Sequence, residues 1–229
     1  MQSRERLIVA LDRSSRDEVL RLADALHGVA GAFKIGLQAF VANGPSLVRE
    51  ITGRGEKVFL DLKIHDIPNT AGRAVAEAAA LGAFMTTVHA AGGAAMLRAC
   101  AAPPGAAALH VLGVTILTSL DAAELQRIGL HGSPVENAVR LAKLCRECGL
   151  RGVVASPEEI EAIRAACGID LTLVVPGVRP EGSAPGDQRR TRTPAAAIAA
   201  GADFIVVGRP VIDARDPCAA ASAILESLP

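Results

Sequence analysis

The sequence predicts a single-domain α/β fold, a (β/α)8 TIM barrel. Short apolar runs rich in β-branched residues recur along its 229 residues, and Ala-rich segments with helix-capping signals separate them. The apolar runs are continuous instead of alternating, as expected for parallel strands that are covered on both faces. No Pro-, Ser- or Gly-rich linker and no block of like charge divides the chain, so we expect one domain over residues 1–229.

Eight strands account for the apolar runs, and a helix is expected after each. The strands are predicted at residues 7–12, 32–36, 57–63, 84–90, 109–117, 152–156, 171–178 and 204–210. An open, doubly wound sheet is the alternative arrangement. Eight strands and the absence of a glycine-rich turn behind the first one favour the closed barrel.

Helix ends are marked by capping residues. A Ser and an acidic first turn begin a helix at Ser15, which we expect to stop at Gly28. Asn69 or Thr70 is placed to cap a later helix, and Gly82 is placed to end it. These signals set the helices between the predicted strands.

Composition excludes several classes of partner. The chain carries 24 acidic and 24 basic residues, so no overall field attracts nucleic acid or an anionic membrane. It contains no Trp or Tyr for stacking on bases. No apolar segment approaches the ~20 residues that span a bilayer, and the run ending at Asp12 does not resemble a signal peptide. We expect a cytoplasmic protein without nucleic-acid or membrane partners.

The cysteines do not indicate a disulfide framework. Five Cys are scattered along the chain, an odd number that fits a reducing cytosol. Cys145 and Cys148 form a CxxC, which could be a redox or zinc motif. Their flanks have a helical pattern and no second pair exists, so helix packing is the favoured interpretation.

Polar residues follow nearly every predicted strand. In a (β/α)8 barrel the catalytic groups gather where the strands end, on one face. The residues found there are Asp12, Lys34, Asp61, Lys63, His89, Thr115, Thr118, Ser156, Arg179 and Arg209. Packing does not explain so many polar residues at one end, so this face is the predicted site.

The segment FLDLKIHDIPNT (59–70) concentrates charge behind the third strand. Asp61 and Lys63 are two residues apart, so on an extended strand their side chains point the same way. Lys34 on the neighbouring strand could lie between carboxylates. Asp66 follows the strand, and its reach back to Lys63 depends on a turn that Pro68 could stiffen. An alternating array of Lys and Asp is the result.

Two other interpretations of this segment remain. It could be a structural ion-pair network or a solvated loop, or Asp61 and Asp66 could bind a metal ion. Two interleaved ammonium groups would repel a divalent cation, which disfavours the metal site. The chain has only four lysines, and two of them, Lys34 and Lys63, stand at strand ends. Lysine can be tuned to give up a proton whereas Arg stays protonated, so a chemical role is favoured.

The last two strand ends predict a phosphate site. PGVRPEG follows the seventh strand and VVGRP ends the eighth, the positions where this architecture usually holds phosphate. Arg209 adds a planar, bidentate partner. The long polar loop around residues 179–193 fits a lid that closes over a ligand, with Gln188 as its candidate contact. Arg189, Arg190 and Arg192 could be solvated instead.

Taken together, these motifs resemble the orotidine 5′-phosphate decarboxylase family across essentially the whole chain. The matching stretches are ALD (10–12), FKIG (33–36), GPSLV (44–48), FLDLKIHDIPNT (59–70), VHAAGG (88–93), VTILTS (114–119), PGVRP (176–180) and VVGRP (206–210). The D-x-K-x-x-D core alone is shared with related sugar-phosphate decarboxylases. The ordered set is what makes the resemblance specific.

The resemblance implies cofactor-free conversion of orotidine 5′-phosphate to UMP, in pyrimidine biosynthesis. It implies that Lys63 protonates C6 and that Asp61 sits against the substrate carboxylate. Asp12 and Lys34 would hold the ribose hydroxyls, with Lys34 also part of the charge array. No metal is implied.

The resemblance also implies a homodimer. Asp66, as a fourth catalytic residue, and Thr70 would be delivered into the partner subunit's site. The other substrate-binding residues implied are Ile67, Pro68, Thr118, Ser119, Pro176, Arg179, Gln188, Gly208 and Arg209, with Thr118 or Ser119 touching the pyrimidine.

Two rival functions stay open from the sequence. One is a magnesium-dependent sugar-phosphate decarboxylase or aldolase of a related barrel type. The other is a phosphometabolite-binding protein without catalytic activity, which would not need Asp61, Lys63 and Asp66 so close together.

Overall fold

The protein is a closed barrel of eight parallel strands, which pair in sequence order with β8 returning to β1. The computed structural model describes residues 3–103, 105–180 and 192–229. The strands are β1 (Leu7–Ala10), β2 (Ala32–Gly36), β3 (Val58–Ile64), β4 (Met85–His89), β5 (His110–Val114), β6 (Gly152–Val154), β7 (Thr172–Val175) and β8 (Phe204–Val207). The predicted fold class and all eight strands are confirmed.

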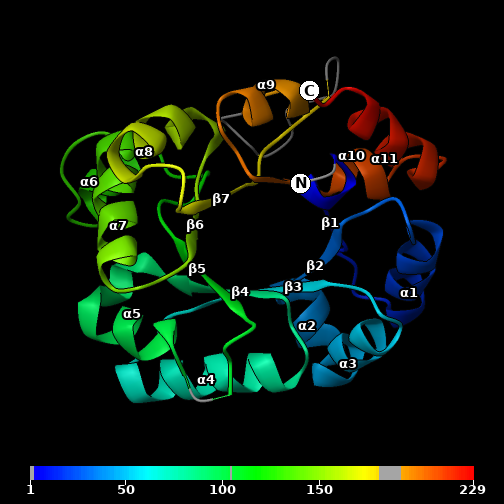
Figure 1. Ribbon diagram of the computed structural model, residues 1–229, viewed down its shortest axis with the longest axis horizontal. Helices are drawn as coiled ribbons and strands as arrows, with labels where there is room; N and C mark the ends of the chain where they lie inside the picture. The colour runs from blue at the N-terminus through cyan, green and yellow to red at the C-terminus, as the bar shows by residue number, and fades with distance from the viewer. Residues whose placement is uncertain (1–2, 104, 181–191) are drawn as a thin grey trace.

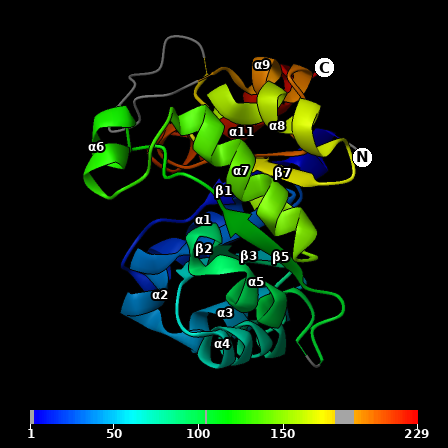
Figure 2. The same ribbon diagram turned by 90° about the vertical axis from the view of Figure 1, so that its left-hand side faces the viewer.

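Helices surround the barrel, as Figure 1 shows, and Figure 2 shows α4, α5 and α7 on the outside of the strands. The α-helices are α1 (Arg16–Ala25), α2 (Leu37–Asn43), α3 (Pro45–Gly53), α4 (Pro68–Ala80), α5 (Gly93–Ala101), α6 (Ala122–Arg127), α7 (Pro134–Glu147), α8 (Ile160–Cys167), α9 (Pro194–Ala199), α10 (Arg209–Ile212) and α11 (Pro217–Glu226). Short 3-10 helices are η1 (Ser3–Arg6), η2 (Ala90–Gly92) and η3 (Pro157–Glu159).

Several strands end earlier than their apolar runs. β5 ends at Val114 and β7 at Val175, where the prediction extended them to 117 and 178. The apolar residues beyond these ends belong to the mouth of the barrel: Ile116 and Pro176 line its cavity. Hydrophobicity therefore overestimates strand length where the loops themselves are packed.

Alternation along the strands separates two cores. Inward-facing residues fill the barrel interior: Ile8, Ala10, Ala32, Phe59, Met85, Leu112, Val174 and Val206. A larger cluster of outward-facing residues packs between the strands and the helices. Because side chains alternate along a strand, the next inward positions above Ala32, Phe59 and Met85 are Lys34, Asp61 and Thr87. The apolar filling of the barrel thus gives way to polar groups at its carboxyl-terminal mouth.

Of two predicted helix caps, one is confirmed and the other is wrong. Ser15 is the N-cap of α1, and its side chain accepts a hydrogen bond from the Glu18 N–H, as expected. The expected cap of α4 at Asn69 or Thr70 is wrong, because α4 begins at Pro68 with Ile67 as its N-cap. Proline suits the first helical position, since its φ is fixed near the helical value and its missing N–H is not needed there.

The CxxC motif lies at the carboxyl end of α7. All five cysteines are free, and Cys145 and Cys148 are both buried. Burial, together with the neighbouring Cys148 and Cys167, raises the pKa of the Cys145 thiol to about 12. Such a thiol is unreactive at neutral pH, so packing explains the motif.

In the described part of the chain, every helix is too short or too polar to cross a lipid bilayer.

Candidate active site

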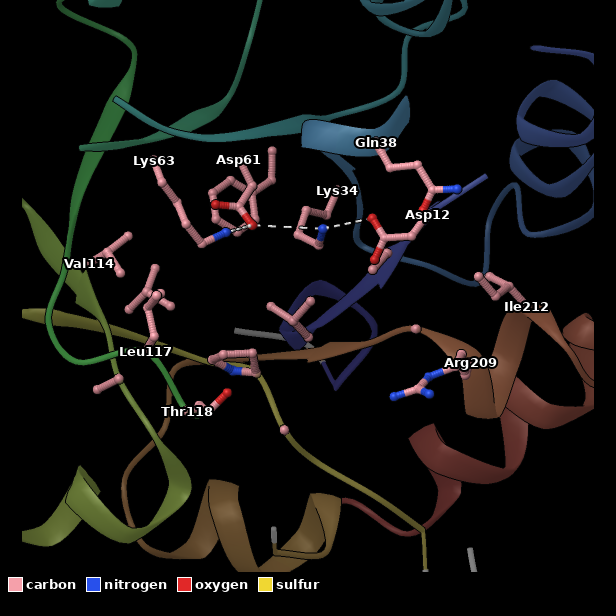
Figure 3. A pocket seen from close by; sticks show the side chains of 18 of the residues that line it. Asp12, Lys34, Gln38, Asp61, Lys63, Val114, Leu117, Thr118, Arg209 and Ile212 are labelled. Atoms are coloured by element: carbon pink, nitrogen blue, oxygen red, sulfur yellow. Dashed lines mark hydrogen bonds and ion pairs between the residues drawn. The ribbon is translucent and has the colours of Figure 1, made fainter. Parts of the chain in front are cut away.

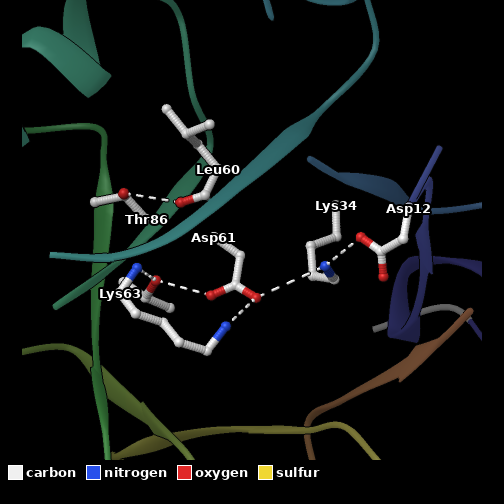
Figure 4. A network of polar contacts seen from close by, with 7 residues as sticks. Asp12, Lys34, Leu60, Asp61, Lys63 and Thr86 are labelled. Carbon is white, nitrogen blue, oxygen red and sulfur yellow. Dashed lines mark hydrogen bonds and ion pairs between the residues drawn. The ribbon is translucent and has the colours of Figure 1, made fainter. Parts of the chain in front are cut away.

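The ends of β1, β2 and β3 hold a row of alternating charges, shown in Figure 4. Lys34 Nζ donates a hydrogen bond to Asp12 Oδ1 at 3.0 Å and lies 3.7 Å from Asp61 Oδ2. Lys63 Nζ donates to the same Asp61 oxygen at 2.8 Å. Adjacent parallel strands place their ends side by side, which brings Asp12 and Lys34 next to Asp61 and Lys63 of β3. The row runs Asp12, Lys34, Asp61, Lys63, and is called the charge array below.

The backbone under Lys63 is not regular strand. Lys63 has φ of 51°, and it is the only non-glycine residue with positive φ among those described. The pairing of β3 with β4 shifts between Leu60 and Ile64. Simple alternation from Asp61 to Lys63 is therefore not what turns the two side chains toward each other. A local bulge with left-handed backbone does so.

Asp61 remains ionised although it is nearly buried. Its side chain is 11% exposed, and the Lys34 and Lys63 side chains are 12% and 33% exposed. Burial by itself raises the pKa of Asp61. The charges of Lys34 and Lys63, with hydrogen bonds from Lys63 and Thr87, outweigh burial and hold the pKa below its usual value. The array is a preformed set of fixed charges.

Two arginines face the opposite side of the same cavity. Figure 3 shows Arg209 across the cavity from Lys63. Burial and the nearby charge of Arg209 lower the pKa of Arg179. The Nε of Arg179 is buried without a hydrogen-bond partner in the part of the chain that the structure describes. Arginine side chains at one side of a cavity are chemically suited to bind an anion there.

The cavity between the array and the arginines measures about 570 Å³. This volume lies within the usual range of small-molecule sites. Apolar side chains from the barrel mouth, including Phe59, Val114, Ile116 and Leu117, line it together with the charged groups. A ligand with an anionic group and a part that packs against apolar side chains would match this lining.

Most of the candidate residues meet at this cavity. Those that line it are Asp12, Lys34, Asp61, Lys63, Thr118, Pro176, Arg179, Gly208 and Arg209. Ser119 is exposed and is not among the described lining residues. Gln188, Arg189 and Arg190 lie outside the described residues, while Arg192 contacts Glu161 on α8 through an ion pair of 3.5 Å.

The segment after β3 lies outside this cavity. Asp66, Ile67, Pro68 and Thr70 are all exposed and are not among the described lining residues. The carboxylate of Asp66 accepts a hydrogen bond from the N–H of Ile67. Within one chain, the array therefore ends at Lys63.

Three polar residues at strand ends have structural contacts instead. Thr115 donates a hydrogen bond to the Val154 carbonyl, and Ser156 caps η3 in a reciprocal capping box with Glu159. His89 stacks on His65 and accepts a hydrogen bond from the Ala91 N–H. The presence of a polar residue at a strand end does not by itself assign it to the site.

The sequence analysis missed two residues. Gln38, on α2, lines the cavity. Thr87, on β4, is fully buried and hydrogen-bonded to Asp61. Its inward position could have been inferred from the alternation of β4, but threonine is also a common strand residue, so type alone gave no signal.

In the described ranges, no group of three or more His, Cys, Asp or Glu side chains is arranged to hold a metal ion.

Comparisons with known proteins extend over the whole chain. A protein named orotidine 5'-phosphate decarboxylase from Anaeromyxobacter dehalogenans is 53% identical over 230 residues, covering 100% of both chains. One of the same name from Moorella thermoacetica is 50% identical over 232 residues, covering 98% of this chain and 92% of the other.

Solved structures show the same fold. The crystal structure of orotidine 5'-phosphate decarboxylase from Lactobacillus acidophilus superposes with a TM-score of 0.84 at 35% identity, covering 96% of this chain and 97% of that one. An uncharacterized conserved protein from Geobacillus kaustophilus gives 0.83 at 34% identity, covering 97% and 100%.

A family profile agrees with these relatives. Residues 5–224 match the profile described as the orotidine 5'-phosphate decarboxylase / HUMPS family. With relatives near 50% identity over the full length and a family profile over residues 5–224, the chain belongs to the orotidine 5'-phosphate decarboxylase / HUMPS family.

Proposed function

We propose that this protein decarboxylates orotidine 5′-phosphate to UMP, the last step of UMP synthesis, without a cofactor. The observation that carries the proposal is the charge array, which faces an anion site across a cavity of nucleotide size. Relatives named for this activity match the chain from end to end. Neither a binding protein nor an ion-pair network needs a lysine held between the cavity and a buried carboxylate.

The two ends of the cavity suit the two ends of the nucleotide. Arg179 and Arg209, with the backbone at Gly208, would hold the phosphate through charge-assisted hydrogen bonds. Asp12 and Lys34 would bind the ribose hydroxyls between the two ends. The pyrimidine would then lie against Thr118 and Pro176, with its C6 toward Lys63, and Ser119 would contact it on closure.

The loop around residues 179–193 would close over the phosphate and bring Gln188 to it. Its base is tied together by the Arg179 N–H, which donates to the Arg192 carbonyl at 3.0 Å. Closure excludes water and allows binding energy from the phosphate to be used at the reacting carbon.

Lys63 would do the central chemistry. The bond between C6 and the carboxylate breaks, CO2 leaves, and the electron pair stays on C6. Lys63 Nζ stabilises this developing charge as a nearby cation and then gives C6 a proton, which forms UMP. Water returns the proton to the amine. An arginine in this place could provide the charge but not the proton.

Asp61 would contribute by repelling the substrate carboxylate. Two like charges ~4 Å apart interact by about 4 kcal/mol at an effective dielectric of ~20. Enzymes typically lower barriers by roughly 8–23 kcal/mol, so repulsion alone is too small. The larger contributions would come from Lys63 and from phosphate binding.

A homodimer would complete the site. The segment from His65 to Thr70 is exposed, and Ile67, at its centre, is 67% exposed. Leu37 and Val41, on α2 behind the neighbouring strand, are also exposed apolar residues. A second copy covering this face would bury these side chains and would receive Asp66 and Thr70, with Ile67 and Pro68, into its own site. We expect the dimer to act in the cytoplasm, where pyrimidine precursors are made.

One assay tests the proposal. The protein, treated with EDTA and dialysed, is incubated with orotidine 5′-phosphate, and CO2 release and UMP formation are followed. We expect full turnover. A magnesium-dependent sugar-phosphate enzyme of the same family would lose its activity after chelation and would act on a sugar phosphate instead. A binding protein would bind UMP and leave the substrate unchanged.

A further inference from the structure

Thr87, on the neighbouring strand β4, joins the last two residues of the charge array, Asp61 and Lys63. Its hydroxyl donates a hydrogen bond to Asp61 Oδ1 at 2.9 Å and accepts one from the Lys63 backbone N–H at 2.9 Å. A hydroxyl has one donor and two acceptor sites, so both bonds form at once. Thr87 is fully buried, and no route to water competes with these bonds.

The hydrogen bond from the Lys63 N–H to Thr87 lies in an irregular stretch of backbone. Between Leu60 and Ile64 the ladder between β3 and β4 is out of register, and Lys63 has left-handed φ. Such a conformation is strained in a residue other than glycine and persists only where its surroundings hold it. The Thr87 hydroxyl gives the Lys63 N–H a partner inside this irregular stretch.

The Thr87 hydroxyl also holds the carboxylate of Asp61 in place. Asp61 uses Oδ2 for both lysines, and Oδ1 receives the hydroxyl of Thr87. With each oxygen occupied, the carboxylate cannot rotate without breaking a contact. Rotation would change the distance between Asp61 and Lys63, and with it the direction in which the amine points.

We propose that Thr87 is a positioning residue for the decarboxylation, holding the Asp61 carboxylate and the backbone of Lys63 in the geometry that aims the amine at the substrate. The inference depends on the proposed function for its kinetic consequence. Thr87 does not line the cavity and would not touch the substrate; it acts through the two residues that do.

The adjacent Thr86 provides a matched control. It is also fully buried on β4, and its hydroxyl donates to the Leu60 carbonyl at 2.9 Å. Figure 4 shows it on the other side of β3 from the charge array. Thr86→Val and Thr87→Val each remove one buried hydroxyl group. Only the hydroxyl of Thr87 contacts the charge array.

The experiment compares Thr87→Val, Thr87→Ser and Thr86→Val in steady-state turnover of orotidine 5′-phosphate, with UMP binding and thermal unfolding measured on each. For Thr87→Val we expect kcat to fall by roughly 10- to 100-fold, the loss of a hydrogen bond to a charged group, with KM and UMP affinity within about threefold. Thr87→Ser keeps the hydroxyl and should recover most of kcat. Thr86→Val should keep kcat within about threefold of wild type even where it is as unstable as Thr87→Val.

The inference is overturned if kcat of Thr87→Val equals that of Thr86→Val, or if serine does not rescue more than valine. Crystal structures of the wild type and Thr87→Val supply a readout that needs no activity. We expect the Lys63 backbone or the contact between Lys63 and Asp61 to change in the variant; an unchanged pair overturns the inference. A wild-type protein without decarboxylase activity would refute the proposed function instead, and the crystal structures would still decide the role of Thr87.

Discussion

Asp61 is a buried carboxylate with a lowered pKa, because two ammonium groups and two hydrogen bonds outweigh its loss of hydration. A carboxyl whose pKa is lower in the folded than in the unfolded chain stabilises the fold when it is ionised. This stabilisation is complete above the pKa of the unfolded chain, about 4, and is lost as the pH falls through the lower folded value.

The first prediction follows from the lowered pKa of Asp61. We expect the unfolding free energy of wild type minus that of Asp61→Asn to be constant above about pH 5 and to decrease as the pH falls below about 4. Urea unfolding at a series of pH values measures both proteins. A difference that is flat across this range, or that grows toward acid, would show that Asp61 is not held by the two lysines.

Arg209 supports a second prediction. Arg209→Ala should lower kcat/KM by roughly 100-fold, as expected from losing a charge-assisted hydrogen bond to the phosphate. Inorganic phosphite added with a nucleoside substrate lacking the phosphate should raise turnover by the wild type and much less by the variant. Arg192→Ala is the control, because Arg192 pairs with Glu161 and should leave kcat/KM nearly unchanged. Lack of activation by phosphite in the wild type would contradict the use of remote binding energy.

At the scale of single residues, the sequence predicted most of the charged residues that line the cavity, together with Thr118, Pro176 and Gly208, and missed Gln38 and Thr87. Asp12, Lys34, Asp61 and Lys63 are recognisable because charged residues at the ends of apolar strands need a reason. Thr87 has no such signature, since its importance comes from a register shift that only coordinates reveal.

At the scale of the elements, β5 and α7 approach closely at Gly113. A methyl group on Gly113 would overlap the sulfur of Cys145, which is buried in α7. Glycine at this position lets the helix approach the strand, and cysteine fills the space above it. This contact explains both residues without redox chemistry.

A double-mutant cycle tests this packing. Gly113→Ala should destabilise the protein by about 1–3 kcal/mol through overpacking. In Cys145→Ala the sulfur is gone, so the added methyl should be tolerated better, with a coupling of at least about 0.5 kcal/mol. Urea unfolding of the wild type, both single variants and the double variant gives the coupling. Additive effects would mean that the two residues do not share this space.

The sequence predicted the number of strands better than the residues at which strands and helices begin and end. Periodicity and capping residues identify eight strands and the start of α1, because these depend on local sequence. The early end of β5 and the bulge in β3 depend on packing at the mouth and on the neighbouring strand, which local sequence does not encode. The start of α4 was missed although Pro68 marks it, because Asn69 and Thr70 also match a cap.

At the scale of the whole molecule, closure of the barrel brings the residues of the candidate site together. Strand order β1 to β8 brings Asp12, Lys34 and Asp61 together on adjacent strands, and brings Arg179 and Arg209 to the ends of β7 and β8. The fold class thus predicted which end carries the site. It did not predict how a second subunit would contribute to it.

Mixing two inactive variants tests the shared site. If Asp66 acts in the partner's site, a dimer of one Lys63→Ala subunit and one Asp66→Ala subunit contains one site with both native residues. Refolding the variants together should restore activity to about one quarter of the wild-type sites, because half of the dimers are mixed. Each variant refolded alone is the control. No recovery in a mixture shown to contain mixed dimers would place Asp66 and Lys63 in the same chain's site, or remove Asp66 from the mechanism.

The central claim is that Lys63 stabilises the charge left on C6 and then protonates it. The most direct measurement is kcat for CO2 release by Lys63→Ala, together with its affinity for UMP, with Lys143→Ala on α7 as the control. We predict that kcat falls by at least about 10³-fold, because both the cation and the acid are lost, while UMP affinity stays within about tenfold and the control is unaffected. A kcat for Lys63→Ala within tenfold of wild type would contradict the account.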